Sequence, residues 1–141
     1  MTLTELYYGL IRRGVRCHSG TYNMECGTDA VTIRLRDGTW GIFLDEGRIH
    51  TTAEEKVAVS HELAHIVTDA TYCMDAPVEL KRIAETIATR KQIETVLPWN
   101  VISDYIRQGL KPYEIAEREN VTERFVNLAL EYYLKKRGRK I

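Results

Sequence analysis

Apolar side chains recur at helical spacing near the start of the chain. Residues 2–13 place leucines and tyrosines three or four positions apart and stop before Gly14, which predicts an amphipathic helix. Residues 17–29 are rich in Gly, Ser, Thr and Asn and lack this spacing, so they predict a loop. The chain therefore opens with one helix and a polar connection.

Two short segments then have the pattern of paired strands. Residues 30–36 alternate apolar and polar side chains, which is typical of a half-buried strand, and residues 39–44 form a second apolar run. Asp37-Gly38 lies between them and is a strong signal for a tight hairpin turn. These residues predict a small antiparallel sheet.

The first of two longer helices is predicted to start near Thr52. Thr52 and Glu55 have the spacing of a capping box, in which a hydroxyl and a carboxylate each bond the other residue's backbone. The helix runs until the break that begins at Asp69. Its apolar stripe, which we expect to face a core, consists of Val59, Leu63, Ile66 and Val67.

A second long helix is predicted after the break at residues 69–76. Pro77 suits the first position of a helix, and Pro98 cannot continue one, so the helix extends from Val78 to about Val96. Its apolar row consists of Leu80, Ile83, Ala84 and Ile87.

Beyond Pro98 the hydrophobic spacing is helical only. It predicts three helices, at residues 99–107, 112–119 and 122–137. Residues 114–126 resemble a helix-turn-helix, in which the second helix enters the major groove of DNA. Here that helix carries an even mixture of charges, so a helical hairpin packed against the rest of the chain is the favoured interpretation.

Together these elements predict an α+β fold that is mostly helical, with a small antiparallel β-hairpin or sheet and a carboxyl-terminal helical hairpin. The length of 141 residues suits one core of ordinary size, and the 44% hydrophobic and 28% charged fractions are those of a globular protein. We expect a single compact domain, with residues 99–141 packed as an extension on a core formed by residues 1–98.

Composition narrows the expected partners and location. Formal net charge is zero, although the chain ends in a basic cluster formed by Lys135, Lys136, Arg137, Arg139 and Lys140. Balanced charge argues against a nucleic-acid partner, because phosphate contacts favour a strongly basic face. No apolar stretch reaches the eighteen or so residues of a membrane span, so no membrane contact is expected. Three cysteines without CxxC spacing indicate reduced thiols and a cytoplasmic protein: Cys17, Cys26 and Cys73.

The sharpest chemical signal is the string His-Glu-x-x-His at residues 61–65. Residues four apart share one face of a helix, so the imidazoles of His61 and His65 can converge on one metal ion. Glu62 lies beside them and could accept a proton from a water bound to that ion. Two imidazoles and an adjacent carboxylate are what zinc-dependent peptide hydrolysis needs. A pair of structural core histidines is the alternative.

A catalytic zinc site needs a third protein ligand, and Glu85 is our choice. A short turn followed by about two turns of an antiparallel helix would bring Glu85 back opposite the two histidines. Glu79 is nearer the turn, and Glu94 is expected on a solvated face. The remaining candidates are less suitable in position or character: His18, His50 and Cys73.

With these residues in place, the chain resembles the ImmA/IrrE-type metallopeptidases, which are small zincins common on phages and mobile elements. The likeness covers most of the chain after the predicted hairpin. It is carried by Thr52–Val57, His61–His65, Glu85–Ala88 before Leu97-Pro98, Glu114–Ala116, Val121–Glu123 and Tyr132-Tyr133.

The resemblance implies a zincin-like core with zinc held by His61, His65 and Glu85, and with Glu62 as the general base. It also implies a protein substrate, typically a helix-turn-helix repressor whose cleavage releases silenced genes. Tyr72, in the turn after the motif, is a candidate for stabilising the oxyanion. Two other functions stay open: a DNA- or repressor-binding module with a structural or vestigial zinc site, and an inactive scaffold.

Overall fold

The computed structural model describes residues 1–22, 28–73 and 75–140. Within them the fold is α+β, with six α-helices and a three-stranded mixed sheet, as the hydrophobic pattern predicts in outline. In chain order the elements are α1 (Leu3–Arg12), β1 (Arg16–Gly20), β2 (Ala30–Arg34), β3 (Trp40–Asp45), α2 (Thr52–Thr68), α3 (Val78–Val96), α4 (Trp99–Arg107), α5 (Pro112–Glu119) and α6 (Glu123–Leu130).

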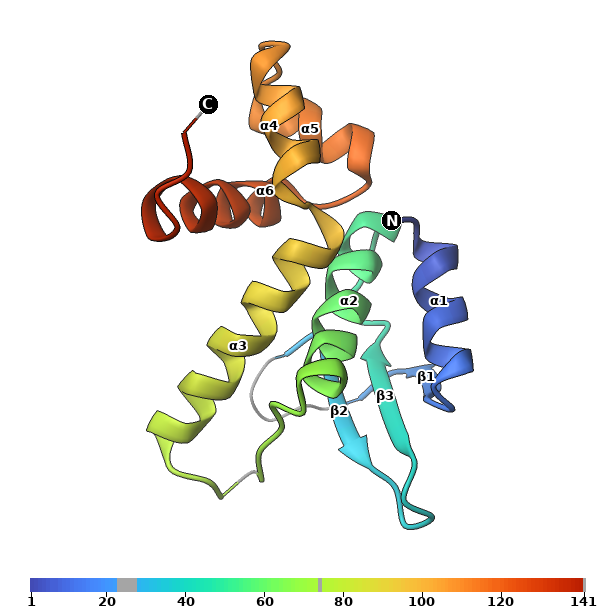
Figure 1. Cartoon of the computed structure of the whole chain (residues 1–141). Helices are drawn as coiled ribbons and strands as arrows, with labels where there is room; N and C mark the ends of the chain where they lie inside the picture. Colours follow the sequence, from blue (N-terminus) through green and yellow to red (C-terminus); the bar gives the residue numbers. More distant parts are fainter. Residues whose placement is uncertain (23–27, 74, 141) are drawn as a thin grey trace.

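Helix α2 lies at the centre of the amino-terminal part (Figure 1). It packs against α1, the sheet and α3, and α3 runs alongside it in the opposite direction. The core between α1, α2 and the sheet contains Leu6, Leu10, Ile42, Leu44 and Val59, all almost fully buried. This packing gives α2 a fixed position between the sheet and α3.

The predicted hairpin is confirmed, since β2 and β3 are antiparallel with Ala30 opposite Leu44 and Arg34 opposite Trp40. Gly38 in the turn has a φ of 87°, a conformation that glycine adopts without strain. The sheet also has a third strand, which the sequence did not predict. β1 pairs in parallel with β3, although all of it except Arg16 falls in the segment predicted as a loop. Residues 23–27 of that segment lie outside the described residues.

The start of α2 differs from the prediction by one residue. Thr51, not Thr52, is the cap, and its hydroxyl accepts a hydrogen bond of 3.1 Å from the Glu54 backbone nitrogen. Glu55 instead accepts a hydrogen bond of 2.7 Å from the Tyr7 hydroxyl on α1. Thr51 and Thr52 can both cap a helix. The carboxylate of Glu55, which the predicted capping box required, is bound to Tyr7 where α1 packs against α2.

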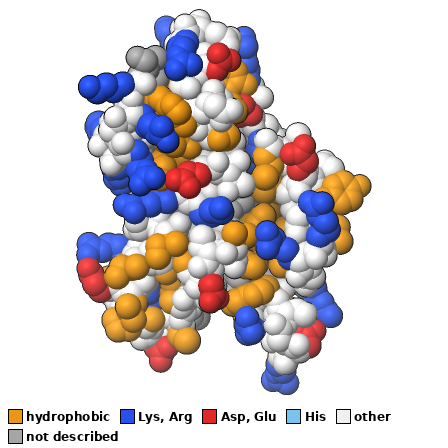
Figure 2. Space-filling view, viewed as in Figure 1, with side chains coloured by type: hydrophobic (Ala, Val, Ile, Leu, Met, Phe, Trp, Pro, Cys, Tyr) orange, Lys and Arg blue, Asp and Glu red, His pale blue; other side chains and the backbone are white. Residues whose placement is uncertain are grey.

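Three of the four residues in the apolar row predicted on α3 do not face a core. Leu80, Ile83 and Ile87 are 56%, 51% and 43% exposed, whereas Ala84 and Ala88 are buried. α3 therefore turns its small residues inward, which lets two helix backbones approach closely. Figure 2 shows hydrophobic side chains gathered where the amino-terminal half of α3 lies.

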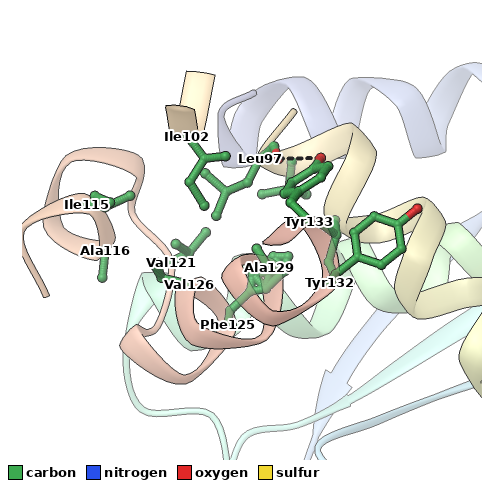
Figure 3. Packing of buried hydrophobic residues seen from close by; sticks show 12 residues of the cluster. Leu97, Ile102, Ile115, Ala116, Val121, Phe125, Val126, Ala129, Tyr132 and Tyr133 are labelled. Atoms are coloured by element: carbon green, nitrogen blue, oxygen red, sulfur yellow. Dashed lines mark hydrogen bonds between the residues drawn. The ribbon is translucent and has the colours of Figure 1, made fainter. Parts of the chain in front are cut away.

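The carboxyl-terminal helices have a core of their own, which includes Ile102, Ile115, Val126 and Ala129 and continues into the end of α3 (Figure 3). The Tyr133 hydroxyl donates a hydrogen bond of 2.8 Å to the Leu97 carbonyl, which ties the last helical segment to the end of α3. The helix predicted over residues 122–137 is divided: α6 ends at Leu130, and Glu131–Lys136 form a π-helical segment.

None of the described helices combines the length and the apolar character that crossing a membrane requires.

Candidate metal centre

The two histidines of the motif lie four residues apart on α2 and point toward α3. Their rings meet edge to face, with centroids 4.8 Å apart and an interplanar angle of 88°. His65 is buried, with 6% of its side chain exposed, while His61 is more open at 24%. One turn of helix therefore presents two imidazoles to the same small region.

Glu85 of α3 completes the cluster. One carboxylate oxygen, Oε2, lies 2.8 Å from Nε2 of His61, and the other, Oε1, lies 3.3 Å from Nε2 of His65. One ligand atom from each of the three residues lies within 4.8 Å of the others. This group can hold a metal ion.

The far side of each imidazole is held by a hydrogen-bond acceptor. Nδ1 of His65 donates a bond of 2.6 Å to the Ala70 carbonyl, and Nδ1 of His61 lies 3.1 Å from Oε1 of Gln92. With Nδ1 protonated in both rings, Nε2 is the nitrogen that a metal ion would bind, in place of the Nε2 protons that face Glu85 in the metal-free protein. The donor set thus fits a divalent cation in chemistry as well as in position.

In the metal-free cluster, electrostatic interactions favour positively charged imidazoles and a negatively charged Glu85. Burial alone would lower the pKa of His61 and of His65, but hydrogen bonds to Glu85 together with the charges of Glu85 and Glu62 outweigh it, and both pKa values are raised. Burial alone would raise the pKa of Glu85, but bonds from both imidazoles and from Tyr72 hold it well below its ordinary value. Glu85 is therefore ionised, as a ligand must be.

Glu62 lies beside the cluster and is 8% exposed. The Thr32 hydroxyl on β2 donates a hydrogen bond to its Oε2. Burial raises the pKa of Glu62, although the Thr32 bond and the two imidazoles oppose that change. A buried carboxylate with a raised pKa has the character of a group that accepts and returns a proton.

Tyr72 contacts the third ligand. Its hydroxyl donates a hydrogen bond of 2.7 Å to Oε1 of Glu85, and its ring centroid lies 6.3 Å from that of His65. The side chain is 41% exposed. Its hydroxyl is therefore at the edge of the candidate site.

The other candidate ligands lie elsewhere. Glu79 pairs with Arg82, the Tyr132 hydroxyl donates to Glu94, and His18 stacks on Phe43. His50 and Cys73 are exposed. Over residues 1–22, 28–73 and 75–140, His61, His65 and Glu85 are the one group of metal-ligating side chains found together.

Sequence reasoning missed two polar residues of the site, Thr32 and Gln92. Thr32 lies in a strand whose pairing with the rest of the chain is not visible from local pattern. The position of Gln92 could have been noticed in the sequence. It lies seven residues after Glu85, so the two share a helix face, and it is next to the apolar Ile93, which is buried in the structure. A polar side chain on a buried helix face is expected to have a hydrogen-bond partner, because buried polar groups rarely lack one.

An apolar hollow of about 460 Å³ lies next to the cluster. We use this name for the space lined by residues 70–73, Ala76 and four residues of α3: Leu80, Ile83, Ala84 and Ile87. Tyr72 belongs both to its lining and to the hydrogen bonds of Glu85. The hollow and the cluster are therefore adjacent.

No protein-family model matches the chain, and no curated protein sequence matches it at a significant level. The likeness to ImmA/IrrE-type metallopeptidases therefore remains a resemblance in motif and spacing.

Proposed function

We propose that this protein is a zinc-dependent endopeptidase of the ImmA/IrrE type. The observation that carries the proposal is the convergence of two Nε2 atoms from α2 and a carboxylate from α3, with Glu62 buried directly beside them. Two imidazoles and one carboxylate are a ligand set of catalytic zinc, which keeps a further position for water or substrate. The partial exposure of His61 and Glu85 supports such an open position.

A zinc ion bound there would supply Lewis-acid activation of a water molecule and of the substrate carbonyl. Glu62 would accept the proton of the attacking water and return it to the leaving nitrogen of the scissile peptide. The Thr32 hydroxyl holds Oε2 of Glu62, so the other carboxylate oxygen stays available for this transfer. The Tyr72 hydroxyl, which donates to Glu85 in this structure, would have to release that bond to donate to the oxyanion.

Two features support a polypeptide substrate. β2 lies at an edge of the sheet, since its one strand partner among the described residues is β3, and it carries Thr32, which contacts the base. An extended peptide could therefore pair with β2 and pass the proposed base. The apolar hollow would accept an aliphatic or aromatic side chain of that peptide.

The resemblance points to a helix-turn-helix repressor of a phage or mobile element as the physiological substrate. Cleavage of that repressor would release the genes that it silences. The zincin-like assignment of the core belongs to the same proposal.

The proposal is tested with zinc-loaded protein and a peptide library prepared from a bacterial proteome, with new termini identified by mass spectrometry. Wild-type protein should generate new termini inside peptides, and Glu62→Gln should bind zinc equally well but lose cleavage by at least about 100-fold. Glu79→Gln, an exposed acid on α3 outside the cluster, is the matched control and should cleave as wild type does. Cleavage that survives Glu62→Gln would contradict the proposed base. Zinc binding without any cleavage by wild-type protein would favour the regulatory-module alternative.

A further inference from the structure

We infer that Gln92 is a positioning residue whose side-chain amide fixes which nitrogen of His61 carries the proton, and so presents the other nitrogen to the metal ion. The inference rests on the metal site of the proposed function, but not on peptidase activity.

Gln92 lies on the same face of α3 as Glu85, two helical turns further on, and is only 3% exposed. Ala88, between them, is fully buried and keeps α3 close to α2. As a result α3 contacts both nitrogens of the same ring. Glu85 lies 2.8 Å from Nε2 of His61, and Gln92 lies 3.1 Å from Nδ1.

The orientation of the Gln92 amide follows from its other contacts. Its Nε2 lies 2.7 Å from the Val57 carbonyl oxygen, which can only accept a hydrogen bond. If the amide were turned over, two oxygen acceptors would face each other at that point. The nitrogen must therefore face Val57, and the amide oxygen must face His61.

Ser60 strengthens this polarity. Its hydroxyl lies 3.1 Å from the Val57 carbonyl, to which it donates, so its oxygen accepts the second hydrogen of the Gln92 amide at 2.8 Å. Every polar atom of the Gln92 side chain is thereby engaged. The Val57 carbonyl thus determines the direction of each bond in the network, as far as the ring of His61.

The consequence for His61 is a proton on Nδ1. An amide oxygen can only accept, so Nδ1 of His61 must donate to it, and Nε2 is left as the ligand atom facing Glu85. For His65 the same function is performed by the Ala70 carbonyl of the backbone. A backbone carbonyl cannot be replaced by mutation, so the orientation of His61, unlike that of His65, can be tested by substituting Gln92.

A purely structural role for Gln92, as a buried link between α2 and α3, makes a different prediction from a positioning role. Gln92→Leu removes the acceptor at His61 and both donors to α2. Gln92→Glu keeps an acceptor for His61 but loses at least one of the donors. If Gln92 only links the helices, zinc affinity should follow stability, and the glutamate variant should recover nothing. If it positions His61, the glutamate should restore what the leucine loses.

The experiment measures zinc dissociation constants by competition with a chromophoric chelator, and thermal unfolding of the metal-free protein, for the full chain. We expect Gln92→Leu to weaken zinc binding about 10- to 100-fold, the usual effect of removing a group that orients a metal ligand. Gln92→Glu should bind zinc close to wild-type strength despite a comparable loss of stability. Ser103→Ala, another buried polar change but in α4, should leave zinc affinity unchanged.

Equal zinc affinity in Gln92→Leu and wild type would overturn the inference while leaving the proposed function intact. So would a glutamate variant no better than the leucine one. If neither variant folds, long-range ¹⁵N–¹H spectra of histidine side chains in zinc-loaded wild type decide the matter. The expected spectrum shows His61 protonated at Nδ1, and coordination through Nδ1 would overturn the inference. Failure of wild-type protein to bind zinc would overturn both proposals.

Discussion

The Thr32 hydroxyl on β2 donates a hydrogen bond to the buried carboxylate of Glu62 on α2. This contact joins the edge of the sheet to the residue proposed as the general base. It restrains one carboxylate oxygen and stabilises the ionised form against the effect of burial on its pKa. Substrate bound along β2 would therefore lie next to a base whose position the same strand determines.

Replacing Thr32 with valine keeps the shape of the side chain but removes this bond. A hydrogen bond to a charged group contributes about 1.5–3 kcal/mol, so cleavage by Thr32→Val should fall roughly ten- to a hundredfold. Thr32→Ser retains a hydroxyl and is the matched control, which should keep most of the activity. Rates of peptide cleavage and zinc content are measured together. Equal rates for the valine and serine variants would rule out a role for the hydroxyl.

Zinc should stabilise the protein more as pH rises. In the metal-free protein the pKa values of His61 and His65 are raised, because contacts with Glu85 and the charge of Glu62 together outweigh burial. Their contribution to stability is therefore complete below pH 6.5 and is lost as pH rises through the raised values. The raised pKa of Glu62 acts in the same direction. Zinc binds only neutral imidazoles. At higher pH fewer protons have to be displaced from the two histidines, so zinc binds more tightly.

This pH dependence is measured as the difference in melting temperature with and without zinc, between about pH 6 and about pH 8.5. The difference should increase steadily across that window. The lowered pKa of Glu85 affects stability only in more acidic solution, below its ordinary value of 4.5. A zinc-induced shift that is constant or decreases with pH would show that zinc does not displace protons from these histidines.

The apolar hollow should determine which peptides are cleaved. Ile83 lines it and is 51% exposed, so Ile83→Asp should change stability by no more than about 0.5 kcal/mol. Zinc content should also be unchanged, but peptides with a large aliphatic or aromatic residue near the cleaved bond should be lost from the products. Leu128→Asp, an exposed apolar residue on α6 outside the hollow, is the control. An unchanged product profile would exclude the hollow from substrate binding.

The parts of the site that arise from local helical geometry were predictable from the sequence. His61 and His65 share a helix face because of their spacing, and Glu85 is brought to them by one short turn between antiparallel helices. The hairpin was predictable for the same reason, since Asp37-Gly38 fixes the turn between adjacent segments. In each case the residues that meet are close in the sequence or separated by a single reversal.

The parts that depend on pairing between distant segments were not predictable. β1 pairs in parallel with β3, so no turn signal links them, and its polar sequence has no alternation. Thr32 meets Glu62 across the contact between sheet and helix. The apolar row of α3 shows why periodicity alone is insufficient: it identifies a hydrophobic face but cannot say whether that face meets a core or solvent. Here only Ala84 of that row faces inward, together with Ala88.

The central claim is that His61, His65 and Glu85 hold one zinc ion. It is tested most directly by anomalous diffraction at the zinc absorption edge from crystals of zinc-loaded protein. We predict a single strong peak about 2.0–2.2 Å from Nε2 of both histidines and from a carboxylate oxygen of Glu85. The peak should vanish in Glu85→Ala crystals grown in the same limiting zinc. A peak at other residues, or none between these three side chains, would contradict the account.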